Sequence, residues 1–121
     1  NYGFIPRTYA EDQDPLDVLV LCQESIVPMT LVECYPIGVL KMIDDDQLDE
    51  KIIAVPFNDP AYSCYKDISE LPNHIFEEIS HFFKVYKSLE GKSTVVNEVL
   101  GAEEAREIIT KCIAFYKDNY C

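Results

Sequence analysis

The chain has 121 residues, of which 48% are hydrophobic, and its 10 basic and 22 acidic residues give a formal net charge of −12. That length suffices for one domain with a sizeable core, so we expect residues 1–121 to form a single domain. The negative charge argues against nucleic acid and anionic membranes as partners, and no apolar stretch reaches the roughly 18–20 residues that span a bilayer. A phosphate substrate stays open, because bound cations reverse the local field.

The five cysteines form no C-x-x-C pair and their number is odd. Both features indicate free thiols in a reducing compartment. No secretory signal stands at the N-terminus. We therefore expect a cytoplasmic protein. An organelle stays open, because the chain begins at Asn1, without methionine and in the middle of an element, as a fragment would.

The first half of the chain is predicted to form strands. Pro36 and Gly38 interrupt the longest of them and predict a bulge or a sharp bend. The acidic stretch 44–50 lies between two apolar segments and is predicted to be a hairpin connection. The three predicted strands are residues 17–22, 31–43 and 51–57.

The second half is predicted to form helices. Ser69 or Asn73 caps a helix that runs to about Leu89, residues 94–96 are an ambiguous short strand, and Gly101 opens a last helix. Strands followed by helices predict an α+β domain. The stripes predicted to be buried are Ile75, Ile79, Phe82 and Tyr86 on the first helix, and Ala105, Ile108, Ile109, Cys112 and Tyr116 on the second.

Three aspartates, Asp12, Asp14 and Asp17, lie within six residues directly before the first predicted strand. Carboxylates this close together repel one another and usually require a cation, and Mg²⁺ prefers such oxygen ligands. An EF-hand loop is excluded, because Leu16 and Asp17 occupy positions where it needs a ligand and a glycine. A nucleotide-sugar D-x-D site stays open, although it usually follows a strand. The simplest alternative is a solvated acidic turn.

A second acidic cluster follows further along the chain. If the strands on either side of it pair, Asp44 and Asp49 lie near opposite ends of the connection, and both reach a metal shared with the first cluster. A charged hairpin tip is the usual meaning of such a run, but a tip that serves only solubility has mixed charge. This cluster consists of Asp44, Asp45, Asp46, Asp49 and Glu50.

Five segments, in order and along essentially the whole chain, share one resemblance. They are Asn1-Tyr2-Gly3-Phe4-Ile5-Pro6, residues 11–20 (EDQDPLDVLV), residues 37–44 (IGVLKMID), residues 49–55 (DEKIIAV), and His81-Phe82-Phe83 with Tyr86-Lys87. The chain resembles the soluble, Mg²⁺-dependent inorganic pyrophosphatases of the single-domain family, and its acidic tip resembles bacterial and plant members. The D-x-D-P-x-D signature is specific to this family. Gln13 departs from it, since the family more often has a small or short polar residue there.

The resemblance implies a fold and an activity. The fold is α+β, an OB-like five-stranded β-barrel, here N-terminally incomplete, with flanking C-terminal helices. The activity is hydrolysis of inorganic pyrophosphate to two phosphates by a metal-activated water, with several Mg²⁺ ions and Mn²⁺ as a substitute. A homo-oligomer is implied as well.

The resemblance also implies roles for individual residues. Asp14 is the candidate general base. Asp12, Asp17 and Asp49 hold the metal nearest the nucleophile, Asp17 bridges to a second metal, and Asp44 with Asp49 serves metals that arrive with the substrate. The residues implied to hold phosphate oxygens are Tyr2, Lys51, Tyr86 and Lys87. Apart from the resemblance, we expect no direct role for Asp45 and Asp46, which are solvated or support the ligands from behind, or for His74 and His81, which are structural.

Family members carry an N-terminal segment that this sequence does not show. The resemblance therefore implies that the 121 residues are the C-terminal two-thirds of such an enzyme, and we expect the isolated chain to hydrolyse pyrophosphate poorly. The alternative from another class is a non-catalytic fragment that acts through cation binding or oligomer contacts. A nucleotide phosphohydrolase is a third interpretation, with no base-recognition motif in its favour.

Overall fold

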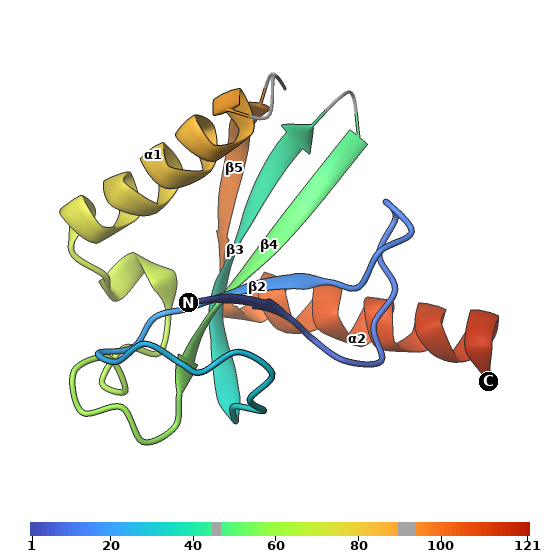
Figure 1. Cartoon of the computed structure of the whole chain (residues 1–121), viewed down its shortest axis with the longest axis horizontal. Coiled ribbons are helices and arrows are strands. Elements are labelled where there is room, and N and C mark those ends of the chain that lie inside the picture. Colours follow the sequence, from blue (N-terminus) through green and yellow to red (C-terminus); the bar gives the residue numbers. More distant parts are fainter. Residues whose placement is uncertain (45–46, 90–93) are drawn as a thin grey trace.

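The computed structural model describes residues 1–44, 47–89 and 94–121, and within these ranges it leaves the side chains of residues 44, 47, 86–88 and 94–97 undescribed. One five-stranded sheet forms the centre of the molecule, with one long helix against each of its faces (Figure 1). The elements in chain order are β1 (Tyr2–Phe4), β2 (Asp17–Val20), β3 (Cys34–Asp44), β4 (Gln47–Pro56), the short 3₁₀ helix η1 (Ile68–Glu70), α1 (Asn73–Leu89), β5 (Thr94–Gly101) and α2 (Ala102–Tyr120).

The sheet is mixed and has the strand order β1-β2-β4-β3-β5. The β2–β4 pair is parallel and the other three pairs are antiparallel. Within the part of the chain that the structure describes, β1 and β5 are the two edges, so the sheet is open. The predicted fold class is confirmed: an α+β domain with the sheet of an incomplete OB-like barrel and helices in its C-terminal half.

Strand β4 is buried on both faces, because its side chains alternate between two hydrophobic clusters. Ile52 and Ala54 pack in the cluster that contains Ala105 and Cys112 of α2. The side chains in between, such as Ile53, pack in the cluster that contains Ile79 and Phe83 of α1. Burial on both faces explains the unbroken apolar run that predicted this strand. Because side chains alternate along a strand, Lys51 and Asp49 lie on the same face of β4 as Ile53, the face that α1 covers.

Three strand predictions need correction. The predicted hairpin is confirmed, since β3 and β4 pair antiparallel, but most of the stretch 44–50 is strand and not connection. Strand β3 continues to Asp44 and β4 begins at Gln47, so Asp49 and Glu50 pair within the ladder with Met42 and Lys41. The short β1 was not predicted, and the ambiguous strand at 94–96 extends to Gly101. Ladder pairing outweighs the low strand propensity of Asp and Glu here. Three further boundaries shift, since β2 ends at Val20, β3 starts at Cys34 and β4 ends at Pro56. The predicted bend is a register shift between Pro36 and Gly38.

The bounds of the two helices are confirmed, and the predicted stripe of α1 is wrong at Phe82, while the side chain of Tyr86 lies outside the described residues. The helix α1 starts at Asn73, one of the two predicted caps, but Phe83 rather than Phe82 is directed into the core. Phe83 is 2% exposed and Phe82 is 50% exposed, because Phe83 is one full turn from the buried Ile79. The stripe of α2 is confirmed, with Ala105 and Cys112 buried. None of the helices among the described residues has the length and apolar character needed to cross a bilayer.

Asp67, just before η1, caps two helices at once. Its Oδ1 accepts a hydrogen bond from the backbone N–H of Ala102, at 2.8 Å, and its Oδ2 accepts from the N–H of Ser69 at 3.0 Å and the hydroxyl of Ser69 at 2.7 Å. These bonds lower the pKa of Asp67. Gly101, the N-cap of α2, has no side chain to offer, and a Cβ there would lie 2.7 Å from Asp67 Oδ1. The cap of α2 therefore comes from a distant segment.

Gly38 lets η1 pack directly on β3. A Cβ at this position would lie 2.7 Å from Cβ of Ile68 and 2.9 Å from the carbonyl oxygen of Leu100. The first of these atoms belongs to η1 and the second to the backbone of β5. The register shift in β3 and the close seat of η1 thus meet at one glycine.

Candidate active site

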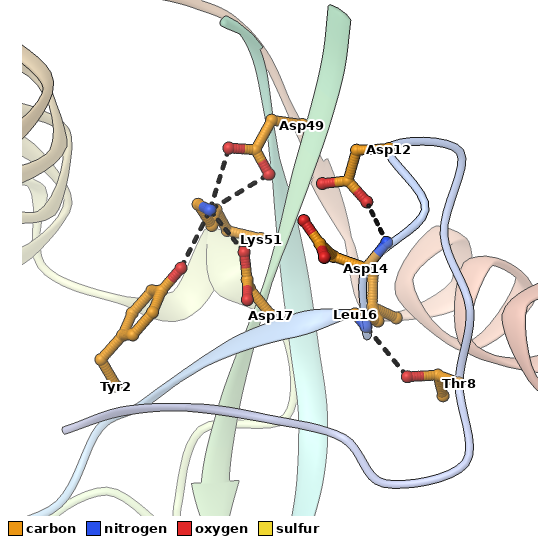
Figure 2. A network of polar contacts seen from close by, with 8 residues as sticks. All are labelled: Tyr2, Thr8, Asp12, Asp14, Leu16, Asp17, Asp49 and Lys51. Atoms are coloured by element: carbon orange, nitrogen blue, oxygen red, sulfur yellow. Dashed lines mark hydrogen bonds and ion pairs between the residues drawn. The ribbon is translucent and has the colours of Figure 1, made fainter.

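The loop between β1 and β2, residues 5–16, carries the first two aspartates and is pinned at its base by Thr8. The Thr8 hydroxyl donates to the carbonyl of Ile5 at 2.6 Å and accepts from the N–H of Leu16 at 2.9 Å (Figure 2). The N–H of Ile5 also donates to the carbonyl of Leu16, at 2.9 Å. Thr8 is 2% exposed and Leu16 1%. The two ends of the loop are therefore held together beneath the carboxylates.

The tip of this loop is a tight turn stabilised by its own aspartate. The Asp12 carboxylate accepts a hydrogen bond from the N–H of Asp14 at 3.1 Å, and the carbonyl of Asp14 accepts from the N–H of Ala10 at 2.9 Å. Between the two aspartates, Gln13 has φ of 67°, in the left-handed region. Residues with a side chain rarely adopt that region, whereas glycine adopts it freely. This conformation gives a physical reason for the smaller residue that the resemblance led us to expect there.

Strand pairing brings the other site residues together. Asp17, the first residue of β2, is the register partner of Lys51 on the parallel strand β4, and Asp49 lies two residues before Lys51 on the same face. The Nζ of Lys51 donates to Asp17 Oδ2 at 2.6 Å, to Asp49 Oδ1 at 3.1 Å and to the hydroxyl of Tyr2 at 2.9 Å (Figure 2). Three strands therefore supply one polar cluster.

Lys51 is a buried cation whose charge is fully compensated. Its side chain is 3% exposed, and that of Asp49 is 10% exposed. Burial disfavours the charged ammonium, but the hydrogen bonds to Asp17, Tyr2 and Asp49 outweigh it and raise the pKa of Lys51. Burial also raises the pKa of Tyr2, to about 12, although Lys51 opposes that shift. At neutral pH the cluster holds a charged lysine beside a neutral phenol.

The carboxylates are directed toward one another. Figure 2 shows the side chains of Asp12, Asp14, Asp17 and Asp49 turned toward a common region. Burial raises the pKa of Asp12, and the negative charges of Asp49, Asp14 and Asp17 raise it further, while a backbone hydrogen bond from Asp14 lowers it. Such mutual repulsion is what a bound cation relieves.

The chemistry of the donor set suits a hard divalent cation, although its described side chains are not gathered around a common centre. Among the side chains that the structure describes, no three His, Cys, Asp or Glu residues are close enough together to form a metal cluster. The Lys51 ammonium stands between two of the carboxylates, and it shows that Asp17 and Asp49 converge on a single cation. All the donors are oxygen atoms, which Mg²⁺ and Mn²⁺ accept and zinc does not prefer.

Six of the nine predicted site residues are placed together by the described part of the structure. Tyr2, Asp17, Asp49 and Lys51 are in direct contact, and Asp12 and Asp14 lie beside them. The other three are Asp44 at the end of β3 and Tyr86 and Lys87 on α1, whose side chains lie outside the described residues, as do Asp45 and Asp46 entirely. His74 and His81 are exposed on α1.

Sequence reasoning missed three residues that build the site. Thr8 gave no signal, since one threonine in a polar loop fits many structures. Leu16 stands as the single apolar residue among the aspartates, and that contrast was a usable signal for a buried anchor. Phe83 was passed over for its neighbour Phe82. These features define a class of domain. It has an open OB-like sheet with two flanking helices and, on one face of the sheet, an acidic cluster with a buried lysine at its centre.

Comparison with known proteins assigns the family. The profile of the family described as "Inorganic pyrophosphatase" matches residues 1–117. Soluble inorganic pyrophosphatase 2 of Chlamydomonas reinhardtii is 49% identical over 120 residues, which cover 99% of this chain and 62% of that protein. A soluble inorganic pyrophosphatase of Oryza sativa subsp. indica is 49% identical over 116 residues, which cover 96% of this chain and 54% of that protein.

Solved structures agree with this assignment. The inorganic pyrophosphatase of Helicobacter pylori matches with a TM-score of 0.91 and 40% identity, over 97% of this chain and 71% of that one. A structure described as an inorganic phosphatase from Anaplasma phagocytophilum matches with a TM-score of 0.90 and 42% identity, over 97% of this chain and 70% of that one. The chain belongs to the inorganic pyrophosphatase family. It spans between about half and two-thirds of the length of the curated relatives it matches.

Proposed function

We propose that this protein hydrolyses inorganic pyrophosphate to two phosphates with the help of divalent cations, and that residues 1–121 are a single domain of such an enzyme. The observation that carries the proposal is the convergence of Asp17 and Asp49 on one cation, the ammonium of Lys51, within 3.1 Å. The same place presents clustered negative charge and hydrogen-bond donors. A metal-bound phosphoanhydride needs both.

The carboxylates hold the cations. We assign Mg²⁺, with Mn²⁺ as a substitute, to Asp12, Asp17 and Asp49, and assign Asp44 to ions that arrive with the substrate. When bound, these ions supply charge neutralisation for the pyrophosphate and a lower pKa for the attacking water. Asp17 lies in a rigid strand pair, so its carboxylate has a fixed direction. Asp12 lies at the tip of the loop, and its side chain is directed toward the other carboxylates.

Asp14 is the general base and the donors orient the substrate. As the water oxygen bonds to one phosphorus, Asp14 accepts the water proton, and the bridging P–O bond breaks to release the second phosphate. Lys51 contributes a point charge, and Tyr2, whose pKa of about 12 keeps it protonated, contributes a neutral O–H donor. Tyr86 and Lys87 have the corresponding role on α1.

The non-catalytic alternative is less well supported. A fragment that only binds cations has no need of a base such as Asp14 or of a buried lysine that competes for the carboxylates. We further propose a homo-oligomer in the cytoplasm. Exposed apolar side chains on the loop before β3, among them Val27 and Leu31 at 74% and 88% exposure, favour association. The five free cysteines favour a reducing compartment.

Calorimetric titration with Mg²⁺ and Mn²⁺ tests the metal assignment. Asp17→Asn is expected to weaken divalent binding strongly, because it removes a charged ligand. Glu107→Gln, which removes a carboxylate from the exposed side of α2, is the matched control and is expected to leave binding unchanged. Equal affinities in Asp17→Asn and the unaltered chain would remove Asp17 from the ligand set.

A phosphate-release assay tests the reaction itself. The 121-residue chain is compared with a longer relative, such as the Chlamydomonas protein, at equal concentration and saturating Mg²⁺. We expect the chain alone to be slower by a factor on the order of 10² or more, because each preorganised charge contact is worth on the order of 10²–10³ in rate. Comparable turnover would show that the residues described above suffice for catalysis.

A further inference from the structure

The Lys51 ammonium has aromatic neighbours as well as polar ones. Its Nζ lies 5.5 Å from the centroid of the Tyr2 ring and 5.8 Å from the centroid of the Phe83 ring, and it stands over the face of each. The two rings contact each other edge to face, with centroids 6.0 Å apart and planes at 61°. Tyr2, Asp17 and Asp49 take the hydrogen bonds of the ammonium, so the contribution of Phe83 is the negative face of its ring.

Phe83 also connects the two halves of the site. It comes from α1, whereas Lys51, Asp17 and Tyr2 come from the sheet. Its side chain packs in the same cluster as Ile53, which follows Lys51 on the same face of β4. Tyr86 and Lys87 lie three and four residues further along α1, on the next turn of the helix. A leucine would fill the same apolar space, but it has no electron-rich face toward the ammonium.

We propose that Phe83 is a positioning residue, whose ring face fixes the Lys51 ammonium at the Asp17–Asp49 carboxylate pair and aligns helix α1 with the sheet. The assignment of Lys51 to the substrate rests on the proposed function, but the contact between Phe83 and Lys51 does not. A desolvated cation–π contact corresponds to roughly a two- to thirtyfold change in an equilibrium constant. Phe83 therefore affects where Lys51 is held without touching the reacting atoms.

The experiment replaces Phe83 by a series of fluorinated phenylalanines in the full chain. Successive fluorines draw electron density from the ring face while the shape and apolar character of the side chain change little. In lysine-labelled protein, the ε-methylene signals of Lys51 are assigned with Lys51→Gln and recorded without pyrophosphate. We expect them to be shifted upfield by the two rings and to be inequivalent in the unaltered chain, and to move stepwise toward free-lysine values as fluorines are added.

Two further variants separate positioning from packing. Phe83→Trp keeps an electron-rich face and is expected to retain the shifted Lys51 signals, whereas Phe83→Leu is expected to lose them. Phe76→Leu, on the same helix and against the same core cluster, is the control that lowers stability but leaves Lys51 unchanged. Lys51 signals that stay the same through the pentafluoro variant would mean that Phe83 acts through packing alone, and the proposal would be wrong.

Kinetics provide a second readout that separates this proposal from the proposed function. In protein that hydrolyses pyrophosphate, the pentafluoro variant is expected to raise KM two- to thirtyfold while kcat changes less, because Lys51 holds the substrate and Asp14 accepts the proton. If no form of the chain hydrolyses pyrophosphate, the proposed function fails and the spectroscopic result still decides the role of Phe83. If KM and kcat are unaltered while hydrolysis is intact, the positioning role fails.

Discussion

The Nζ of Lys51 lies 2.6 Å from Oδ2 of Asp17, the residue directly opposite it in the parallel β2–β4 ladder. A second ion pair, to Asp49, has an N–O distance of 2.9 Å. The lysine thus holds together two carboxylates that we assign to a divalent cation. An ammonium and a metal ion compete for the same oxygens, and this competition has measurable consequences.

Lys51→Met is expected to tighten Mg²⁺ binding and to weaken pyrophosphate binding. Two positive charges on a metal and one on an ammonium about 4 Å apart repel by roughly 2 kcal/mol even in water, so removing the lysine tightens Mg²⁺ binding by at least about tenfold. Without metal, the variant is expected to be about 2–3 kcal/mol less stable, since the Asp17 side chain is 28% exposed and water moderates the cost of its unpaired charge. Calorimetry and thermal unfolding with and without Mg²⁺ measure both effects. The control is Lys117→Met, which removes an exposed lysine of α2. Identical Mg²⁺ affinities in the two variants would contradict the competition.

Asp14→Asn is expected to lower kcat by orders of magnitude in a hydrolysing form of the protein, while Mg²⁺ affinity changes little. A base acts only in the transition state, whereas a ligand already acts in the ground state. Asp14 is exposed, and its backbone N–H and carbonyl form the hydrogen bonds that shape the loop tip, so the amide substitution leaves the loop intact. Initial rates at saturating Mg²⁺ and calorimetry are the measurements. Abolished metal binding together with substantial remaining turnover would make Asp14 a ligand.

Gly38→Ala is expected to destabilise the fold by about 1–3 kcal/mol, because the new Cβ meets Ile68 and the backbone of Leu100 within 2.9 Å. Gly3→Ala is the matched control, since a Cβ at Gly3 meets nothing within 4 Å. That control is expected to change the free energy of unfolding by about 0.5 kcal/mol or less. Urea denaturation of the three proteins makes the comparison. A Gly38→Ala protein as stable as Gly3→Ala would show that η1 can move away from β3 at little cost.

Asp67→Ala is expected to cost about 1–2 kcal/mol, because it removes the caps of η1 and α2 together. Asp67→Asn keeps one acceptor oxygen but replaces the other with an NH2 donor, so it loses the charge and one of the two caps. Since the pKa of Asp67 is lowered by folding, its charge stabilises the fold above its ordinary value of 3.8, and this stabilisation is lost as the pH falls through the lower pKa of the folded state. The stability gap between the unaltered chain and Asp67→Asn, measured by denaturation from pH 7 downward, is therefore expected to narrow below pH about 3.8. A gap that does not narrow at all as the pH falls below 3.8 would argue against the charge as its source.

The sequence predicted elements with strong periodicity and missed those decided by tertiary contacts. The apolar run of β4 and the stripe of α2 were readable because burial fixes their composition. The strand character of Asp49 and Glu50 was not readable, since only their partners Met42 and Lys41 across the ladder hold them extended. Likewise, β1 is three residues long and takes its conformation from β2.

The carboxylates of the candidate site could be predicted from the sequence, but the residues that hold them in place could not. Motif spacing identified the aspartates, because like charges so close in sequence are uncommon without a cation, and the family resemblance added Lys51. Nothing in one sequence tells that Thr8 bonds to both Ile5 and Leu16, or that Phe83 rather than Phe82 is directed toward Lys51. Those roles depend on the angle at which the loop and α1 meet the sheet.

The parallel pairing of β2 with β4 also determines when the site can form during folding. The antiparallel β3–β4 pair is a local hairpin, whereas Asp17 and Lys51 are separated by 34 positions of chain. The closure entropy of that long loop must be overcome before the pair gains its contacts, so the hairpin is expected to form early and the β2–β4 ladder late. The ion pair between Asp17 and Lys51 then stabilises a strand pairing that forms only after the hairpin. Until that pairing forms, the nascent chain exposes an acidic loop and one bare edge of β4.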